Sequence, residues 1–224
     1  MGNRTVQIRD LKSPEELQTA SRSRLYQLLE QAFLFPDTPF YESVRDGGFG
    51  EQLLAAAGGL PYALPSDAGE SWPTAAPSSY EDFQAEYIRL FDVGVGAPPC
   101  PLYGGIYAGG RKQVLEEVCR FYEYFGLKLP PKLRELPDHI TTELEFLHFL
   151  TFKEAAALHQ GKDRTSYLRA ERDFLERHPG RWVPLLAQRL AGQSPLPFFE
   201  GLVGLTEGFL AQDRAYVRRI VKAD

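Results

Sequence analysis

The residues of this sequence that could do chemistry gather in two segments. The first is the run PPCPLYGGIY at 98–107, which combines a cysteine and a glycine pair with two tyrosines four residues apart. The second, at 138–150, holds two histidines and two glutamates. The first segment is compatible with three kinds of site: a glycine-rich loop that holds a phosphate, a redox-active cysteine, or a rigid elbow beside a groove. The second segment raises the question of a metal.

The glycines of the first segment invite comparison with phosphate-binding loops. Gly104-Gly105 and Gly109-Gly110 precede Arg111 and Lys112. The P-loop pattern requires Ser or Thr after the lysine and a strand before the loop, and neither is found in this sequence. Glycines ahead of a helix can still offer free N–H groups to an anion. A structural turn is the favoured interpretation, and a nucleotide-binding enzyme remains an alternative.

Metal and thiol chemistry receive weaker support. His139 and Glu143 share a helical face, and Glu145 and His148 form one Glu-x-x-His pair, whereas a di-iron bundle needs two such pairs and two further carboxylates. The sequence has four histidines in all, so chance spacing is favoured over a metal-dependent enzyme using His139, Glu143 and His148. The two cysteines form no CxxC motif, and we expect them to be reduced thiols.

The aromatic residues around the first segment indicate recognition. Tyrosine combines an apolar ring with a polar tip and is typical of half-wet binding surfaces, and rigid Pro/Gly backbone beside it suits a peptide groove. Acidic side chains nearby would favour a basic partner. The aromatic residues are Tyr80, Phe83, Tyr87, Phe91, Tyr103 and Tyr107, with Leu90 among them, and the acids are Glu86, Asp92 and Asp138.

The elements that must position these residues are predicted to be helices. Ser13, Pro14 and Glu16 form a start signal, with Ser13 as the N-cap. A buried stripe is predicted to follow it, made of Leu17, Leu25, Leu28, Leu29, Ala32 and Phe33. Asp138 is predicted to cap the helix that carries the second segment. The predicted helices lie within 13–35, 47–59, 79–94, 110–126, 138–159, 165–177, 182–191 and 197–219.

No run alternates with the period of a strand, so the predicted fold class is all-α. We expect one compact multi-helix domain over residues 1–224, with a Pro-rich loop at 61–79 and a Pro/Gly elbow at 97–110. The chain has 224 residues and a net charge of -5, which argues against nucleic acid as a partner. The N-terminus has no apolar signal-peptide region and no run is long enough to span a membrane, so we expect a cytoplasmic protein without stable membrane association.

Several motifs in fixed order resemble a known family. EYIRLFDVG, PPCPLYGGIY and LPDHITTELEFLHFLTFKEA, preceded by RLYQLLEQAFLFPD, look like the TorD/DmsD/NarJ family of redox-enzyme maturation chaperones. The resemblance covers about residues 20–215. The elbow is similar to that of members dedicated to type II DMSO-reductase-like molybdoenzymes of the ethylbenzene, dimethylsulfide, selenate or chlorate type.

The resemblance implies an all-helical chaperone rather than an enzyme. Its partners would be the apo catalytic subunit of a molybdoenzyme and the twin-arginine leader of that subunit, held until the molybdopterin cofactor is inserted. The resemblance implies no cofactor for the chaperone itself, although GTP binding occurs in some relatives, and it allows a monomer or a domain-swapped dimer. The site residues that match the family motifs are Tyr87, Leu90, Phe91, Tyr103, Tyr107, Pro137, Asp138, His139 and Glu143.

Overall fold

The computed structural model describes residues 11–65, 75, 77–92, 97–128 and 135–223. All regular structure in these ranges is helical, apart from one isolated antiparallel bridge between Tyr103 and His139. The helices are α1 (Pro14–Ala32), α2 (Thr38–Arg45), α3 (Gly48–Gly58), α5 (Tyr80–Phe91), α6 (Gly104–Tyr107), α7 (Arg111–Tyr124), α8 (Ile140–His159), α9 (Thr165–Arg177), α10 (Pro179–Ala191) and α11 (Pro197–Ala223). The predicted all-α class is therefore confirmed. No described helix combines the length and the apolar character that crossing a bilayer would require.

Local sequence signals set most helix boundaries. The Ser13 side chain accepts from the Glu16 N–H and the Glu16 carboxylate accepts from the Ser13 N–H, which is the predicted capping box. Ser79 caps α5 in the same way through the Asp82 N–H. Helix α2 lies between two of the predicted helices and was not itself predicted. Pro39 lies in its first turn, where proline costs no hydrogen bond, and Asp37 caps the helix.

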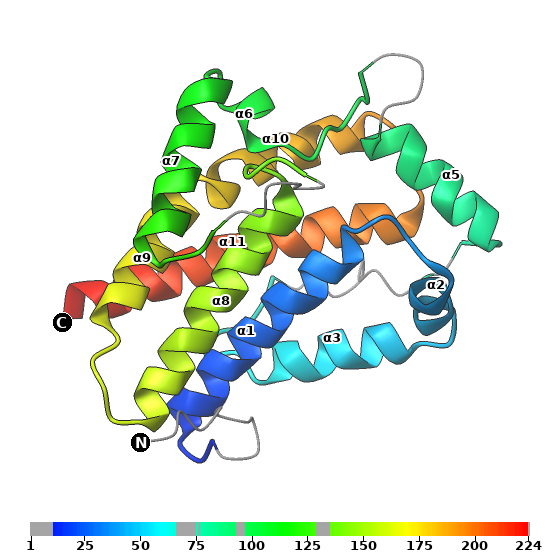
Figure 1. Cartoon of the computed structure of the whole chain (residues 1–224). Helices are drawn as coiled ribbons and strands as arrows, with labels where there is room; N and C mark the ends of the chain where they lie inside the picture. Colours follow the sequence, from blue (N-terminus) through cyan, green and yellow to red (C-terminus); the bar gives the residue numbers. More distant parts are fainter. Residues whose placement is uncertain (1–10, 66–74, 76, 93–96, 129–134, 224) are drawn as a thin grey trace.

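The longest interhelical seam joins α1 and α8, which run antiparallel (Figure 1). Ser23 Oγ lies 2.9 Å from His148 Nδ1 near the middle of the seam, and Glu16 lies 3.6 Å from His159 at one end. Helices α9, α10 and α11 lie behind the α1–α8 pair in the view of Figure 1 and pack against it. The buried apolar side chains form one continuous core that extends from Leu25 to Leu210.

Four helices meet at the buried guanidinium of Arg22. Its Nε lies 2.5 Å from Asp213 Oδ1 on α11, its Nη1 2.8 Å from Glu154 on α8, and its Nη2 2.5 Å from Glu171 on α9. Tyr26 also donates to Asp213, over 2.6 Å. Replacing this arginine by an uncharged residue would lower the free energy of unfolding, because the carboxylates would remain buried without a counter-charge.

The predicted stripe of α1 is only partly correct. Leu25, Leu28 and Leu29 are fully buried, but Leu17 is 45% exposed. The N-terminal half of α1 turns Thr19, Arg22 and Ser23 inward instead. An apolar-period rule cannot find an inward-facing arginine, because nothing in its own helix identifies the acids that neutralise it.

The first prediction concerns this ionic cluster. Replacing Arg22 by Met should lower the free energy of unfolding by about 3–5 kcal/mol, because three acids lose their shared cation. Arg24→Met is the matched control: Arg24 lies two residues away on α1 and, among the described residues, donates to the side-chain amides of Gln27 and Gln52 and to no carboxylate. The control should stay within about 0.5 kcal/mol of the parent chain. Urea unfolding measures both, and equal effects of the two variants would contradict the assignment.

Candidate functional site

The candidate site is formed where the elbow, residues 97–110, docks on the N-terminal end of α8. The Gly104 N–H donates to the backbone oxygen of Asp138 over 2.9 Å, and the Ile140 N–H donates to the Leu102 oxygen over 2.9 Å. The side chain of Asp138 accepts from the Gly105 N–H, also over 2.9 Å. We call this region, together with the contacting residues of α10, the elbow site.

The prediction that Asp138 caps α8 is wrong. The N-cap residue is His139, whose Nδ1 accepts from the Thr141 N–H over 3.3 Å. Asp138 is fully buried and fixes the elbow instead. The Gly104 and Gly105 N–H groups that a phosphate would need are consequently engaged by Asp138, and the structure favours an elbow over a phosphate loop.

The two glycines are required by close approach. A Cβ atom at Gly104 would lie 2.7 Å from Trp182 Nε1, and one at Gly105 would lie 2.9 Å from Asp138 Oδ2. Real Cβ contacts of this length essentially never occur. Glycine is therefore the residue that lets the elbow reach α10 and the aspartate at the same time.

Glu143 lies beneath the elbow and is fully buried. Its Oε2 accepts from Trp182 Nε1 over 2.8 Å. Burial, together with the nearby charge of Asp138, raises the pKa of Glu143 well above its ordinary value, while the Trp182 hydrogen bond opposes the shift. Burial therefore favours the protonated form of Glu143, and this side chain is not a solvent-facing member of the site.

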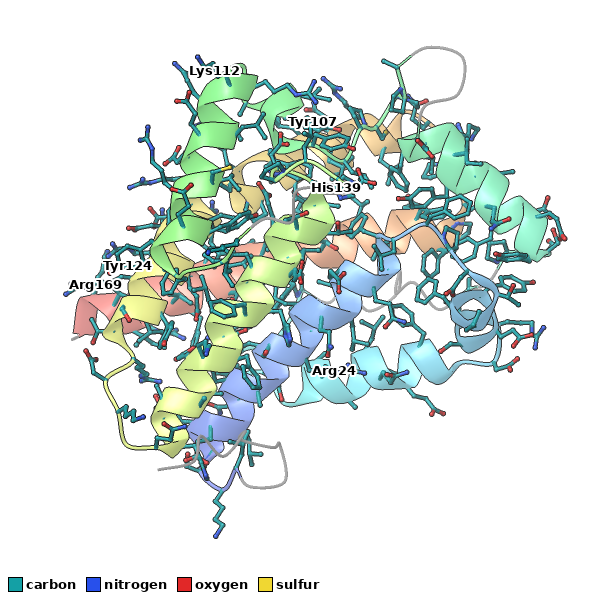
Figure 2. All side chains as sticks on the ribbon, in the orientation of Figure 1. Arg24, Tyr107, Lys112, Tyr124, His139 and Arg169 are labelled. Carbon is teal, nitrogen blue, oxygen red and sulfur yellow. The ribbon has the colours of Figure 1, made fainter. Side chains whose placement is uncertain are left out.

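Two tyrosines form the outer layer of the elbow site. The Tyr103 hydroxyl donates to Glu135, and its ring meets the His139 ring edge-on at 4.9 Å. Tyr107 stacks on Trp182 with ring centroids 5.3 Å apart, and the Arg189 guanidinium lies 4.5 Å from the centre of the Tyr107 ring. Figure 2 labels Tyr107 and His139 together near the start of α8. Burial lowers the pKa of His139 to about 4, so this ring is neutral at neutral pH.

The α5 residues lie deeper than the sequence indicated. Leu90 is fully buried and Phe91 is 5% exposed, so in this conformation both belong to the core. Tyr87 donates to the Phe33 oxygen over 2.9 Å. Burial raises the pKa of Tyr87, and so do the charges of Glu135 and Asp92 and the nearby Tyr103, which places Tyr87 beside the outer layer. Pro137 contributes its backbone oxygen, which accepts from the Tyr122 hydroxyl over 2.9 Å.

Sequence reasoning missed three members of this region: Phe35, Glu135 and Leu136. Phe35 packs edge-on against Tyr87 at 5.4 Å and remains 48% exposed, and Leu136 is 38% exposed. The predicted acidic rim also changes, because Asp138 is buried and Glu86 is bound to Arg89. Of the three missed residues, only Phe35 had a signal in the sequence, because it is apolar and follows the apolar stripe of α1.

The arrangement has little capacity for covalent or metal chemistry. Burial raises the pKa of the Cys100 thiol, which disfavours the reactive thiolate. Within the described ranges, no three His, Cys, Asp or Glu side chains form a group that could hold a metal ion. His148, part of the alternative metal set, is bound to Ser23 instead. The fold and the site define an all-helical protein whose elbow is held in place by Asp138 and by the start of α8.

Comparison with known proteins gives this class its family. Residues 51–188 match the family described as Nitrate reductase delta subunit. The perchlorate reductase assembly chaperone of Dechloromonas aromatica is 34% identical over 197 residues, covering 85% of this chain and 87% of the relative. The chlorate reductase assembly chaperone of Ideonella dechloratans is 46% identical over 167 residues, covering 74% of each chain. The dimethyl sulfide dehydrogenase assembly chaperone of Rhodovulum sulfidophilum is 33% identical over 195 residues, covering 81% of this chain and 74% of the relative.

The chain belongs to the nitrate reductase delta subunit (TorD/NarJ) family. The relatives named above are assembly chaperones, not enzymes. The predicted family resemblance is therefore confirmed. The nine predicted site residues remain a prediction, of which Tyr103, Tyr107, Pro137, Asp138, His139 and Glu143 lie together at the elbow site.

The close approach of Gly104 to Trp182 gives a testable prediction. Gly104→Ala should lower the free energy of unfolding by about 1–3 kcal/mol, because the added methyl group overpacks against the indole. Gly204→Ala is the matched control, since no atom lies within 4 Å of a Cβ at that position in α11. Alanine there should be neutral or stabilising by up to about 1 kcal/mol. Thermal unfolding measures both, and a neutral Gly104→Ala would refute the close contact.

A further prediction concerns Glu143. The unfolded chain releases this proton near its ordinary pKa of about 4.5, whereas the folded state retains it to higher pH. The stability of the parent chain should therefore fall by up to about 1.4 kcal/mol per pH unit above that value, relative to Glu143→Gln, which cannot ionise. Urea unfolding of both chains from pH 5 to pH 8 tests this.

The difference in free energy of unfolding should move in favour of Glu143→Gln as the pH rises. A difference that stays constant with pH would mean that Glu143 is ionised in the folded state. Infrared spectra give an independent control, because the carbonyl stretch of a protonated carboxyl group at neutral pH should be lost in the variant.

Proposed function

We propose that this chain is the assembly chaperone of a molybdenum oxidoreductase of the type II DMSO reductase class. It binds the apo catalytic subunit in the cytoplasm and, at the elbow site, the twin-arginine leader of that subunit, before cofactor insertion and export. The relatives named for perchlorate, chlorate and dimethyl sulfide enzymes support this client class. No nucleic acid and no stable membrane association enter this function.

The observation that carries the leader-binding step is that Glu135, which accepts from the Tyr103 hydroxyl, lies within electrostatic reach of Tyr87, against which the exposed Phe35 packs. Leu136, next to Glu135 in the chain, is exposed as well. A leader of this type combines a basic pair with an apolar stretch, and a carboxylate beside apolar surface complements both parts. Asp138 and Glu143 act indirectly in this proposal, because they fix the elbow that carries Tyr103.

No described contact favours the alternative enzyme functions. The glycine N–H groups are bound by Asp138, and His139 and Glu143 are bound by Thr141 and Trp182. GTP binding and a domain-swapped dimer remain predictions from the family resemblance.

Titration calorimetry with a twin-arginine leader peptide of a candidate type II molybdoenzyme tests the proposal. The parent chain should bind the peptide at micromolar concentration, and Glu135→Gln should weaken binding about tenfold, because a charge-assisted hydrogen bond to arginine is lost. Glu81→Gln removes an exposed acid from the first turn of α5 and should leave the affinity unchanged. Phe35→Ser should weaken binding through the apolar part of the leader.

The peptide controls separate the contribution of the arginine charges to leader binding from the contribution of the apolar stretch. Replacing the two arginines of the leader by alanine should weaken binding to the parent chain but have little further effect on Glu135→Gln. Equal binding of both peptides to the parent chain, or an unchanged affinity in Glu135→Gln, would remove the leader from the elbow site. Asp138→Ala is unsuitable as a probe, because it breaks the hydrogen bond to the Gly105 N–H that positions the elbow.

A further inference from the structure

A second open surface lies between α7 and α9. The groove has a volume of about 760 Å³ and is lined from Gln113 to Phe125 on one side and from Asp163 to Arg177 on the other. Eleven residue steps along α7 correspond to about 17 Å, or three helical turns. None of the elbow-site residues lines it. The described contacts across the groove include one ion pair, Arg177 with Glu117 at 2.9 Å.

The floor of the groove is aromatic and held in place. The Phe121 ring is packed edge-on against Phe174 at 5.2 Å, and the Phe125 ring stacks on Tyr167 at 5.7 Å. Tyr124 lies edge-on to Phe125 at 5.0 Å and is 76% exposed, more than any other large hydrophobic side chain reported as exposed in the described ranges. A tyrosine this open at the end of a fixed aromatic row stabilises the fold little and is available to a partner.

Four acids and three arginines line the groove, and three of the acids have a basic partner within 4.0 Å. Glu117 binds Arg177, Asp173 binds Arg172 at 2.7 Å, and Glu116 lies 3.9 Å from Lys112. Asp163 accepts from both the N–H and the hydroxyl of Thr165.

Two arginines of the lining are not engaged in this way. No hydrogen bond or ion pair joins Arg120 or Arg169 to another described residue. Arg169 lies close enough to Asp163 for its charge to contribute to lowering the pKa of Asp163, after the hydrogen bonds of Thr165. Figure 2 labels Arg169 beside Tyr124 at the C-terminal end of α7. The groove therefore offers two arginines without a hydrogen bond or ion pair to a described residue, one of them within electrostatic reach of Asp163, next to an exposed aromatic ring.

We propose that this groove binds an acidic amphipathic helix of a partner protein. Leucine or phenylalanine side chains on one face of that helix would contact Phe121, Tyr124 and Phe125, and carboxylates flanking that face would meet Arg120 and Arg169. The length of three turns and the row of rings favour a helix over a compact anion. This surface is separate from the elbow site and carries the opposite charge preference, so it does not depend on leader binding.

The probe is a synthetic 14-residue helix, capped at both ends, with Leu and Phe on one face and Glu elsewhere. Calorimetry on the full chain at low salt should give a dissociation constant of the order of 10 μM. The variant Arg120→Glu/Arg169→Glu should weaken binding about tenfold or more, because two attractions become repulsions. Tyr124→Ser should weaken binding without changing its salt dependence. A peptide with Lys in place of Glu should not bind.

Matched controls keep the outcome decisive. Arg24→Glu/Lys12→Glu makes the same change in net charge at two positions in and just before α1 that do not line the groove, and this variant should bind the acidic helix as the parent does. If the charge-reversed pair fails to fold by circular dichroism, Arg120→Ala/Arg169→Ala replaces it, with a smaller expected loss. Absence of binding by the acidic helix, equal binding of the lysine peptide, or equal affinity in the groove variants would overturn the proposal. Displacement of the acidic helix by millimolar pyrophosphate, together with an unchanged affinity of Tyr124→Ser for the helix, would assign the groove to a compact anion instead.

Discussion

The buried guanidinium of Arg22 is the interaction on which the rest of the structure depends. It joins α1 to acids from α8, α9 and α11, helices that are far apart in the sequence. Desolvation works against every charge in this cluster, and it raises the pKa of Glu171 well above its ordinary value. The cluster is therefore stable only when Arg22 contacts all three acids at once. An ionic centre of this kind favours one packing of the four helices over others in which an acid would be left alone.

The same frame determines where the elbow can dock. Helix α8 carries Glu154 into the Arg22 cluster and begins, about four turns earlier, beside Asp138 and the elbow. Glu143 and Trp182 join α8 to α10 between these two points. Fixing α8 at its ionic end consequently fixes the platform for Tyr103 and His139. The buried acids differ in role: Asp138 holds the elbow backbone, Glu143 accepts from the Trp182 indole, and Glu154 neutralises an arginine.

The two open surfaces differ in charge and share one helix. Helix α7 begins with Arg111, whose guanidinium lies 6.0 Å from the centre of the Tyr103 ring, and ends with Tyr124 at the α7–α9 groove. At the elbow, Glu135 accepts from the Tyr103 hydroxyl beside the exposed Arg111, whereas the groove holds Arg120 and Arg169. A chaperone that makes no covalent bond distinguishes its clients by complementary surfaces, and the two proposed binding surfaces at the ends of one helix would offer more discrimination than one.

The sequence by itself determined the local features of this protein. Ser13 with Glu16, and Ser79 with Asp82, act within three residues, so the caps and most helix bounds could be read from the chain. The order of the motifs was enough to recognise the family, and six of the nine site residues predicted from them lie together at the elbow site. Only the tertiary structure decided the burial of Arg22, the exposure of Phe35 and the role of Asp138. Arg22 and Asp138 have partners more than 30 positions away in the chain, and the exposure of Phe35 depends on which other helices cover it. No local pattern encodes which distant atoms will neutralise a charge or cover a ring.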